Sequence, residues 1–541
     1  MNSSIPSEMA VSKRAHTAWA VGSLVLLSLV LNIWNLDFGL PYRYHADEVL
    51  VIDSAFWTVG NGMRPDNYYY GAFHLYTLIL LDGLFFVVGL ATGLFQNIAE
   101  FKELFYTYRD PFVLIGRLAS VLYGTGIVIT SWLMARILLK HKGWAYLVGF
   151  LAAISPIVVE HSHYGIVDIP MTFWISVSLI FAMRAYETGK IRDYLFCAVC
   201  AGVATSTKYT AILLGVAPVI SFLLSRKRPP ILHFILTLAA LPLTFLLTSP
   251  FLILDFKNAV SAILWNRRQV VDIGNFGINP EGSGYVDGLK YLSMGVGIPS
   301  LLLGLLGTVL FVMKQNKRIF PLLGFSALHV SVIGGWKNSY ARYWLPLVPI
   351  CLVAAVAVLQ DCDKWVGSRL KMTTRFFLIA FCVLVLAISP IKGVMSFQRE
   401  LVLPDTRTMA CEWIYENIPA GSHFITEPAW CMPQLSSKWF KVTRIHGFGI
   451  GKLQNYAALK SYGADFVITS SDQRKNFEAE PGRFPGASIY SQLDESAELL
   501  KVVKEGPNRQ GSTIYIYALP IIASTHPPEQ TQPQSPEKNM P

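Results

Sequence analysis

The stretch PYRYHADEVLVIDSAFW, residues 41–57, places His45, Asp47 and Glu48 directly after an apolar run of membrane-span length. A carboxylate in such a place can take a proton from a reacting hydroxyl group. Asp47 can also be structural, because an acidic residue at the start of the following apolar helix is stabilised by the helix dipole. A capping box needs Glu or Gln at position 50, which is Leu, so Glu48 has no capping role. We therefore favour a functional role for the pair.

A second polar cluster occupies SPIVVEHSHYGIVDIPMTFW, residues 155–174. Its ionisable residues are Glu160, His161, His163 and Asp168, within nine positions at the ends of two apolar runs. Ionisable groups at span ends mark a functional site by default, although a solvated loop with a capping aspartate is the structural alternative. A divalent cation is a further alternative, but the spacing matches no metal motif, so no cofactor is assigned.

Basic residues form a third group. Arg117 lies in GRLASVLYGTG, Lys208 in TSTKYTA and Arg342 in YARYWLPLVP, each near the end of an apolar run. Each can be a snorkelling anchor. Three cations on the same face as the carboxylates favour an anion site, which Arg267, Arg268 and Lys337 can extend.

This combination suits sugar transfer from a lipid phosphate. The phosphate leaves as a stable anion, a carboxylate deprotonates the acceptor, and Arg or Lys stabilises the charge that develops on the phosphate. A single displacement inverts the anomeric carbon. The candidates for catalysis are Asp47, Glu48 and Asp168, those for phosphate binding are Arg117, Lys208 and Arg342, and those for substrate binding are His45, His161, His163, Tyr69, Tyr209 and Tyr343.

The elements that must position these residues are membrane spans. Of the 541 residues 53% are apolar and 15% charged, and apolar runs recur to about residue 392, which is typical of a polytopic membrane protein. Eleven spans are predicted, at 17–36, 113–139, 144–159, 169–186, 193–207, 210–224, 231–250, 291–313, 319–335, 342–359 and 375–392. The first run lacks a signal-peptide cleavage site, so we expect it to remain as a span.

Charge distribution orients the spans. Loops such as RILLKHK (136–142) and KQNKR (314–318) are rich in Lys and Arg, which predicts a cytoplasmic N-terminus, provided that residues 71–95 do not cross the bilayer. We expect those residues to form a re-entrant or interface-lying helical pair within a large first outer loop, residues 37–112. The net charge of +10 arises from these short loop clusters, so nucleic acid binding is not expected.

The composition changes at about residue 393. We predict a membrane domain over 1–392, a small extracytoplasmic α/β domain over 393–523 and a disordered tail over 524–541. Within the α/β domain, helices are expected at 405–419 and 495–503 and strands at 422–427 and 464–471. Cys411 and Cys431 can pair if this domain is extracytoplasmic.

Several motifs resemble the GT-C glycosyltransferases, specifically the glycosyltransferase family 39/83-like group of protein O-mannosyltransferases and the aminoarabinose transferase of lipid A. YHADE resembles their first-loop Asp-Glu signature, IGRLASVLYGTG their Arg-containing second span, and the loop ending in Asp168-x-Pro170 a third motif. AGVATSTKYTAILL, ARYWLPLVP and DTRTMACEWIYENIPAGS follow in the same order, so the resemblance covers most of residues 17–475.

The resemblance implies Asp47 as catalytic base, Asp168 as a supporting acidic residue and a polyprenyl-phosphate sugar as donor. It also implies the GT-C fold and a large first outer loop with interface helices. Where the aminoarabinose transferases carry Lys-Pro for the lipid phosphate, this chain has Asn67-Tyr68. Arg117, Lys208 or Arg342 is expected to make that contact instead.

The sequence therefore predicts an inverting glycosyltransferase of the bacterial inner membrane that transfers a sugar from a polyprenyl-phosphate donor to an extracytoplasmic lipid, glycan or protein. A secondary transporter or lipid flippase is one alternative, although transporters tend to place charges near the bilayer midplane and only Asp82 lies deep in an apolar run. A non-catalytic membrane assembly subunit is the other.

Overall fold

The chain divides into two compact units in the computed structural model. The first contains Met1–Asp405 with Gly506–Gln510, and the second Thr406–Glu505 with Gly511–Pro541. The described residues are 5–273, 283–337, 339–428, 431–445, 449–479, 482 and 484–520, so the predicted tail at 524–541 lies outside them.

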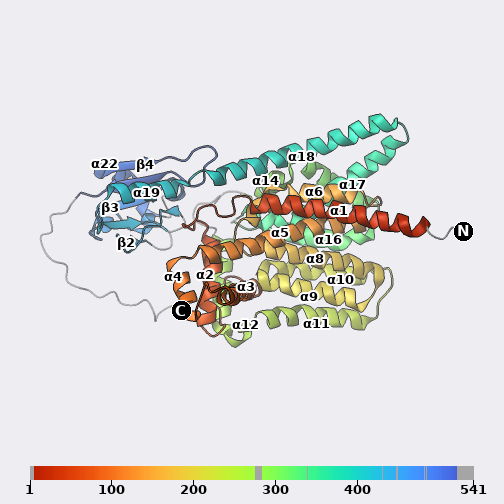
Figure 1. Cartoon of the computed structure of the whole chain (residues 1–541), viewed down its shortest axis with the longest axis horizontal. Coiled ribbons are helices and arrows are strands. Elements are labelled where there is room, and N and C mark those ends of the chain that lie inside the picture. The colour runs from red at the N-terminus through yellow and green to blue at the C-terminus, as the bar shows by residue number, and fades with distance from the viewer. Residues whose placement is uncertain are drawn as a thin grey trace. The chain divides into compact units, whose positions relative to one another are not determined.

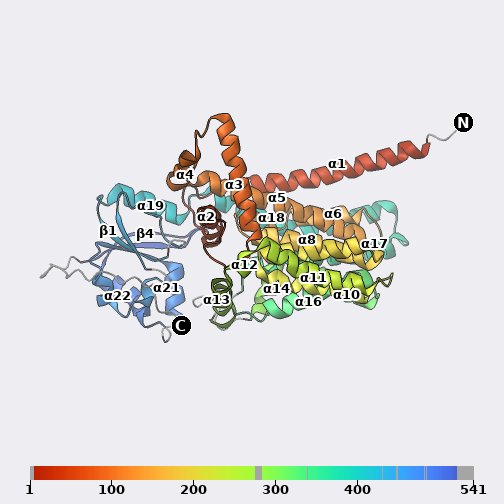
Figure 2. The same cartoon turned by 90° about the horizontal axis from the view of Figure 1, so that it is seen from below.

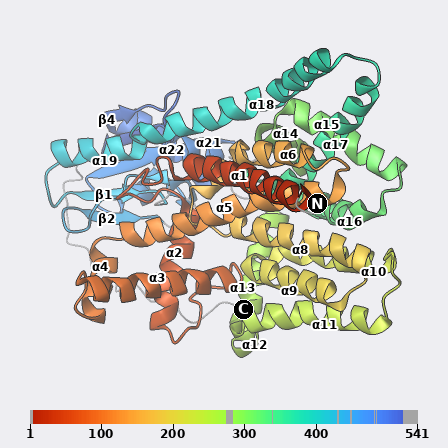
Figure 3. The ribbon, with the colours of Figure 1, turned by 45° about the vertical axis from the view of Figure 1, so that its right-hand side comes forward.

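The first unit is a helical bundle in which α8, α9, α10 and α11 run side by side (Figures 1 and 3). Its helices are α1 (Ile5–Ile33), α2 (Ala46–Gly60), α3 (Phe73–Thr92), α4 (Ile98–Thr107), α5 (Asp110–Leu138), α6 (Trp144–Ala153), α7 (Pro156–Ser162), α8 (Asp168–Thr188), α9 (Ile191–Thr207), η1 (Tyr209–Gly215), α10 (Val216–Leu223), α11 (Ile231–Thr248), α12 (Phe251–Leu254), α13 (Phe256–Arg267), η2 (Arg268–Ile273), α14 (Gly284–Val296), α15 (Ile298–Met313), η3 (Lys317–Ile319), α16 (Phe320–Ile333), η4 (Ala341–Leu347), α17 (Val348–Gly367) and α18 (Met372–Val402).

Within the described residues, seven helices are long and apolar enough to cross a membrane, or up to nine spans if each bent helix pair counts as one. The predicted count of eleven is not confirmed. Three of the predicted spans correspond to short elements, namely α9, η1 with α10, and α16. The seven include α3, which the charge argument kept outside the bilayer.

The first outer loop carries α2, α3 and α4. Residues 73–92 form one continuous helix through Asp82 and Gly83, so the predicted helical pair is wrong. This helix runs across the direction of the bundle helices, end-on in Figure 1 and lengthwise in Figure 2. One side of this helix exposes Leu80, Leu84, Val87, Val88 and Leu90, as expected for a helix that lies against lipid, and the other side packs on the protein.

Two spans are broken at positions that matter for the site. Helices α6 and α7 meet at 51°, and α14 and α15 meet at 114° around Gly297, whose φ of +81° lies in a region that favours glycine. Ser155 lies at the first break and donates a hydrogen bond to the carbonyl of Gly295, 2.7 Å away. This bond joins the two breaks, and α7 leads directly into the loop before Asp168.

The second unit is a five-stranded sheet in the order β2-β1-β3-β5-β4. Its elements are α19 (Thr406–Asn417), β1 (His423–Thr426), β2 (Lys441–Arg444), η6 (Ile450–Lys452), α20 (Tyr456–Lys460), β3 (Phe466–Ser470), α21 (Ser471–Glu478), η7 (Pro485–Ala487), α22 (Ser488–Ser496), β4 (Glu498–Val503) and β5 (Ile514–Ala518). Strands β2, β1 and β3 are parallel, whereas β5 is antiparallel to both β3 and β4. The small α/β architecture is confirmed.

One element of this unit was predicted with the wrong type. The segment ESAELLKVV, expected to be a helix, ends α22 and then forms β4. Its second half pairs with β5, where Val503 lies opposite the fully buried Ile514. The tertiary pairing therefore overrides the local helical pattern. Cys411 and Cys431, which were considered as a pair, direct their thiols to the carbonyl oxygens of Gln434 and Pro428.

Candidate active site

The site begins at the first turn of α2. His45 is the N-cap residue, and its Nδ1 accepts the backbone N–H of Glu48 at 3.3 Å. Asp47 is therefore not the cap, although both carboxylates lie in the first turn, where the helix dipole favours negative charge. The His45 ring packs on Tyr164 with 4.4 Å between ring centroids.

Glu48 is enclosed in the protein. Its two carboxylate oxygens each accept a hydrogen bond of 2.9 Å from Arg117, and Oε1 also accepts the N–H of Gly165 at 2.8 Å. Arg117 donates further to the carbonyls of Leu36 and Phe38. The Glu48 side chain is 0% exposed and the Arg117 side chain is 2% exposed. Burial alone raises the pKa of Glu48, but Arg117 outweighs it and holds the pKa below its usual value.

Asp47 belongs to a different group of charges. Arg342 from η4 lies 3.0 Å from Asp47 Oδ2 and 4.0 Å from Asp168 Oδ2, and Lys208 lies 2.6 Å from Asp168 Oδ1. The charges thus alternate along the series Asp47, Arg342, Asp168 and Lys208. Four separate segments supply them, namely α2, η4, the start of α8 and the link between α9 and η1.

Three polar atoms in this series have no hydrogen-bond partner within the described part of the chain. They are Asp47 Oδ2, Asp168 Oδ2 and Arg342 Nε, and all three are buried atoms. The 4.0 Å separation between Arg342 Nε and Asp168 Oδ2 is too long for a hydrogen bond. Unsatisfied buried atoms are costly, so a cluster of two acceptors and one donor without hydrogen bonds marks a candidate ligand site.

Tyrosine rings surround the two cations. Lys208 Nζ lies 4.6 Å from the ring centroid of Tyr343 and 5.7 Å from that of Tyr70, and Arg342 lies 5.4 Å from Tyr343. Burial and then the charge of Asp47 raise the pKa of Tyr70, so this side chain lies within electrostatic reach of Asp47. Sequence reasoning selected Tyr69 and missed Tyr70, because the run Tyr68-Tyr69-Tyr70 does not reveal which ring faces the site.

The electrostatics keep Asp47 ionised. Burial raises the pKa of this carboxyl, but the charges of Arg342, His45 and Lys208 outweigh burial, so the pKa lies below its usual value. Its side chain remains 21% exposed, in contrast to Glu48. An ionised and accessible carboxylate is what a general base requires.

A cavity of about 270 Å³ opens beside these residues. Its polar lining is Tyr69, Tyr70, Lys208, Tyr209, Thr210, Asn266, Arg267 and Tyr343, and its apolar lining is Ile212, Leu213, Ile263, Val270, Val271, Val332 and Trp336. The cavity therefore combines cationic groups with an apolar wall.

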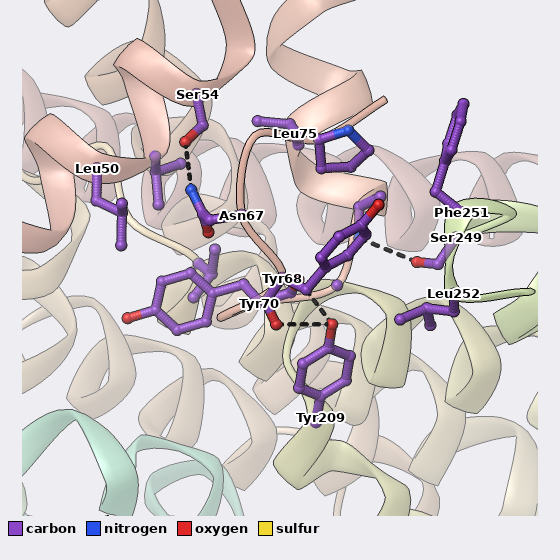
Figure 4. A pocket seen from close by; sticks show the side chains of 15 residues that line it. Leu50, Ser54, Asn67, Tyr68, Tyr70, Leu75, Tyr209, Ser249, Phe251 and Leu252 are labelled. Atoms are coloured by element: carbon purple, nitrogen blue, oxygen red, sulfur yellow. Dashed lines mark hydrogen bonds between the residues drawn. The ribbon is translucent and has the colours of Figure 1, made fainter. Parts of the chain in front are cut away.

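The remaining sequence-predicted residues face the backbone or the cavity wall. His161 Nδ1 bonds to the carbonyl of Ile157, and the two ring nitrogens of His163 lie 2.7 and 2.9 Å from the carbonyls of Val159 and Trp34. Tyr209 also bonds to backbone, as Figure 4 shows. The structure thus brings together Asp47, Asp168, Lys208, Arg342 and Tyr343, with His45 adjacent, and separates from them Glu48, Arg117, His161 and His163.

No group of three or more His, Cys, Asp and Glu side chains that could hold a metal ion occurs among the residues that the structure describes. Both acidic residues of the open site face a cation already.

Comparisons with known proteins find similarity to parts of this chain and to its fold. A family profile described as dolichyl-phosphate-mannose-protein mannosyltransferase matches residues 111–254, which include Asp168 and Lys208. Dolichyl-phosphate-mannose–protein mannosyltransferase 1 of Candida albicans is 28% identical over 218 residues, which is 38% of this chain and 23% of that protein. The matched region thus spans about a quarter of this curated relative.

Two solved structures share the fold. The oligosaccharyltransferase AglB of Archaeoglobus fulgidus, in complex with an inhibitory peptide and a dolichol-phosphate, superposes with a TM-score of 0.54 and 12% identity over 90% of this chain and 73% of that one. ArnT of Cupriavidus metallidurans in the apo state superposes with a TM-score of 0.51 and 15% identity over 93% of this chain and 98% of that one. The chain therefore has the GT-C fold, which confirms the resemblance seen in its motifs.

Proposed function

We propose that this chain is an inverting glycosyltransferase that moves a sugar from a polyprenyl-phosphate carrier to an extracytoplasmic acceptor. The observation that carries the proposal is the cluster of buried atoms without a hydrogen bond, Asp47 Oδ2, Asp168 Oδ2 and Arg342 Nε. An acceptor hydroxyl can donate to Asp47 Oδ2, and a second hydroxyl of either substrate can join Asp168 to Arg342.

The reaction follows from these positions. The acceptor oxygen attacks the anomeric carbon while its proton passes to Asp47. The bond between that carbon and the phosphate oxygen breaks, and its electron pair stays on the phosphate. Lys208 and Arg342 stabilise the developing charge, because fixed cations in a site shielded from water act strongly. Attack opposite to the leaving group inverts the configuration.

Charge and shape favour a lipid-linked phosphate as the leaving group. Lys208 and Arg267 both line the cavity, so cationic groups face the space that a phosphate would occupy. The apolar wall of the same cavity suits a prenyl chain. The mannosyltransferase relative is named for a dolichyl-phosphate donor, and AglB binds a dolichol-phosphate.

The proposal includes an orientation in a bacterial inner membrane. The N-terminus is cytoplasmic, and the site and the domain over 393–523 are extracytoplasmic. The crossing direction of α3 supports this assignment, because it allows residues 71–95 to lie at the interface without inverting the loops that follow. The acceptor is a lipid, glycan or protein on that side.

The test uses purified protein in detergent with short-chain polyprenyl-phosphate sugars and a membrane extract as acceptor source. Mass spectrometry then measures free polyprenyl phosphate. Wild-type protein should release it, and Asp47→Asn should not, whereas Asp66→Asn, an exposed carboxylate of the same outer loop, should match the wild type.

Two outcomes would reject the proposal. Release of polyprenyl phosphate by Asp47→Asn at the wild-type rate would show that Asp47 is not the base. No release by wild-type protein with any donor would show that the chain is not a transferase of this kind. Substrate counterflow in proteoliposomes that does not depend on Asp47 would instead support the transporter alternative.

A further inference from the structure

The segment Tyr68–Tyr70 forms one edge of the site and contributes residues to its cavity. Tyr70 is its functional end, because its ring centroid lies 5.7 Å from Lys208 Nζ and both residues line the same cavity. Burial and the charge of Asp47 raise the pKa of Tyr70, so the hydroxyl keeps its proton. The position of this ring depends on the backbone that carries it.

Side chains from distant segments hold that backbone. The Tyr209 hydroxyl, from η1, donates to the carbonyl oxygens of Tyr68 at 3.2 Å and Tyr70 at 2.9 Å (Figure 4). One hydroxyl hydrogen shared between two acceptors keeps both carbonyls turned toward η1. The Tyr209 ring is in turn packed edge-on against Phe245 of α11.

The middle carbonyl is held from another side. Asn266, in the last turn of α13, donates from Nδ2 to the carbonyl of Tyr69 at 3.1 Å. The neighbouring Trp265 packs on the Tyr69 ring at 5.4 Å, and the Tyr68 hydroxyl donates to Asp255 at 2.8 Å. Each of the three backbone carbonyls of the segment thus accepts a hydrogen bond from a side chain.

The backbone immediately after Tyr70 is closely packed against neighbouring helices. A Cβ on Gly71 would lie 2.2 Å from the carbonyl oxygen of Ser206. The N–H of Ala72 donates to Ser249 Oγ at 3.0 Å, and that hydroxyl lies 2.6 Å from the hydroxyl of Ser206. Helices α9 and α11 therefore fix the end of the segment that follows Tyr70.

We infer that Tyr209 and Asn266 are positioning residues that hold the Tyr68–Tyr70 backbone so that the Tyr70 ring stays beside Lys208 in the wall of the donor cavity. This inference rests on the proposed transferase function. It replaces the sequence-based assignment of Tyr209 to substrate binding, because its hydroxyl is engaged by two backbone carbonyls.

Loss of this positioning should change kcat rather than donor binding. Without the Tyr209 hydroxyl the Tyr70 carbonyl is released, and the Tyr70 ring no longer has a fixed distance to Lys208. The chemical step then slows, whereas the cations and apolar wall of the donor cavity are unchanged. The effect should fall on kcat and leave polyprenyl-phosphate binding intact.

A double-mutant cycle tests the connection. Tyr70→Ala should lower kcat about 2- to 30-fold, the range for a lost cation–π contact with Lys208. Tyr209→Phe should lower kcat by no more than that. The double variant should match Tyr70→Ala alone, since Tyr209 acts through Tyr70. Asn266→Ala should behave like Tyr209→Phe, and it provides the second variant if Tyr209→Phe does not fold.

The matched control is Tyr76→Phe, which removes a hydroxyl-to-carbonyl bond of 3.2 Å to Met63 in the same outer loop. It should leave kcat unchanged. Losses that multiply in the double variant, or weaker polyprenyl-phosphate binding by Tyr209→Phe, would overturn the inference while transfer by the wild type continues. A wild type without transfer would overturn the proposed function and the inference together.

Discussion

Asp47 and Glu48 are adjacent in the first turn of α2, yet they have opposite environments. Glu48 is fully buried, and two N–H groups of Arg117 and one of Gly165 satisfy it. Asp47 is partly exposed, and its Oδ2 has an ion-pair contact but no hydrogen bond within the described residues. Successive residues of an α-helix project about 100° apart, so one carboxylate faces α5 and the other the open site.

The difference separates two uses of a carboxylate. A charge with every hydrogen bond made is a fixed part of the structure, and its removal leaves its partner buried and unpaired. A charge with an unfilled acceptor position is available to a substrate. Isosteric amide variants of the two residues therefore give opposite results.

The largest expected effect is on catalysis by Asp47→Asn. The amide cannot accept the proton of the acceptor, so kcat should fall by about 10²–10⁴-fold, the range for a lost general base. The melting temperature should remain near that of the wild type, because the Asp47 side chain is partly exposed. Polyprenyl-phosphate release and thermal unfolding of the same preparation measure both quantities.

Glu48→Gln should show the reverse pattern. Breaking one side of a buried ion pair costs about 3–5 kcal/mol of stability, so thermal unfolding in detergent should begin at a clearly lower temperature. The fraction that remains folded should transfer sugar at close to the wild-type rate. Folded Glu48→Gln protein without activity would contradict the comparison and give Glu48 a direct part in the reaction.

A third variant addresses why Asp47 is ionised. Arg342 lowers the pKa of Asp47 against the effect of burial, so in Arg342→Gln that pKa should rise. A base is lost when it is protonated, so the acidic limb of the pH–rate profile should move to higher pH. Arg342→Lys keeps the charge and should shift the limb less. His45 and Lys208 also face Asp47, and an unmoved limb in Arg342→Gln would assign the effect to them.

The smallest effect is expected in the second unit, where Glu427 is buried and has no ion pair among the described residues. It accepts hydrogen bonds from Tyr490 and from the N–H of Ser470, and burial raises its pKa to about 8. The folded unit holds this proton and the unfolded chain releases it, so stability should fall as the pH rises from about 4.5 to 8.

Glu427→Gln should flatten this pH dependence, while Asp472→Asn, an exposed carboxylate of α21, should not. Calorimetry of the full chain between pH 5 and 8 measures the change, which is at most about 1.4 kcal/mol for each unit of pKa difference. A second unit that is more stable at pH 8 than at pH 5 would contradict the assignment of the proton to Glu427.

Residue type and order revealed much of the site. Asp47, Asp168, Lys208 and Arg342 stood out as charges at the ends of apolar runs, and the structure brings them together. The sequence did not show which of these charges pair with one another, because the pairing depends on how α2, α5, α8 and η4 pack. Arg117 therefore appeared equivalent to Lys208, although it pairs with Glu48.

Local geometry explains the other differences. The histidines near Asp168 appeared as a polar cluster in the sequence, but a turn of α7 directs His161 and His163 to carbonyls four residues earlier. The fold class followed from composition and motifs, whereas the span count did not, since short elements such as α9 and α16 fall below the length of a full crossing. Propensity alone also could not identify β4, which depends on β5.

Gly71 has a consequence for how this site tolerates mutation. It lacks a side chain, and a single added methyl group would overlap the backbone of Ser206 in α9. Any replacement there must displace the backbone segment that carries Tyr70, although the new side chain would touch no substrate. Surveys that substitute the charged and aromatic residues would overlook this position. Random mutagenesis under selection for transfer should find it almost as invariant as the base itself.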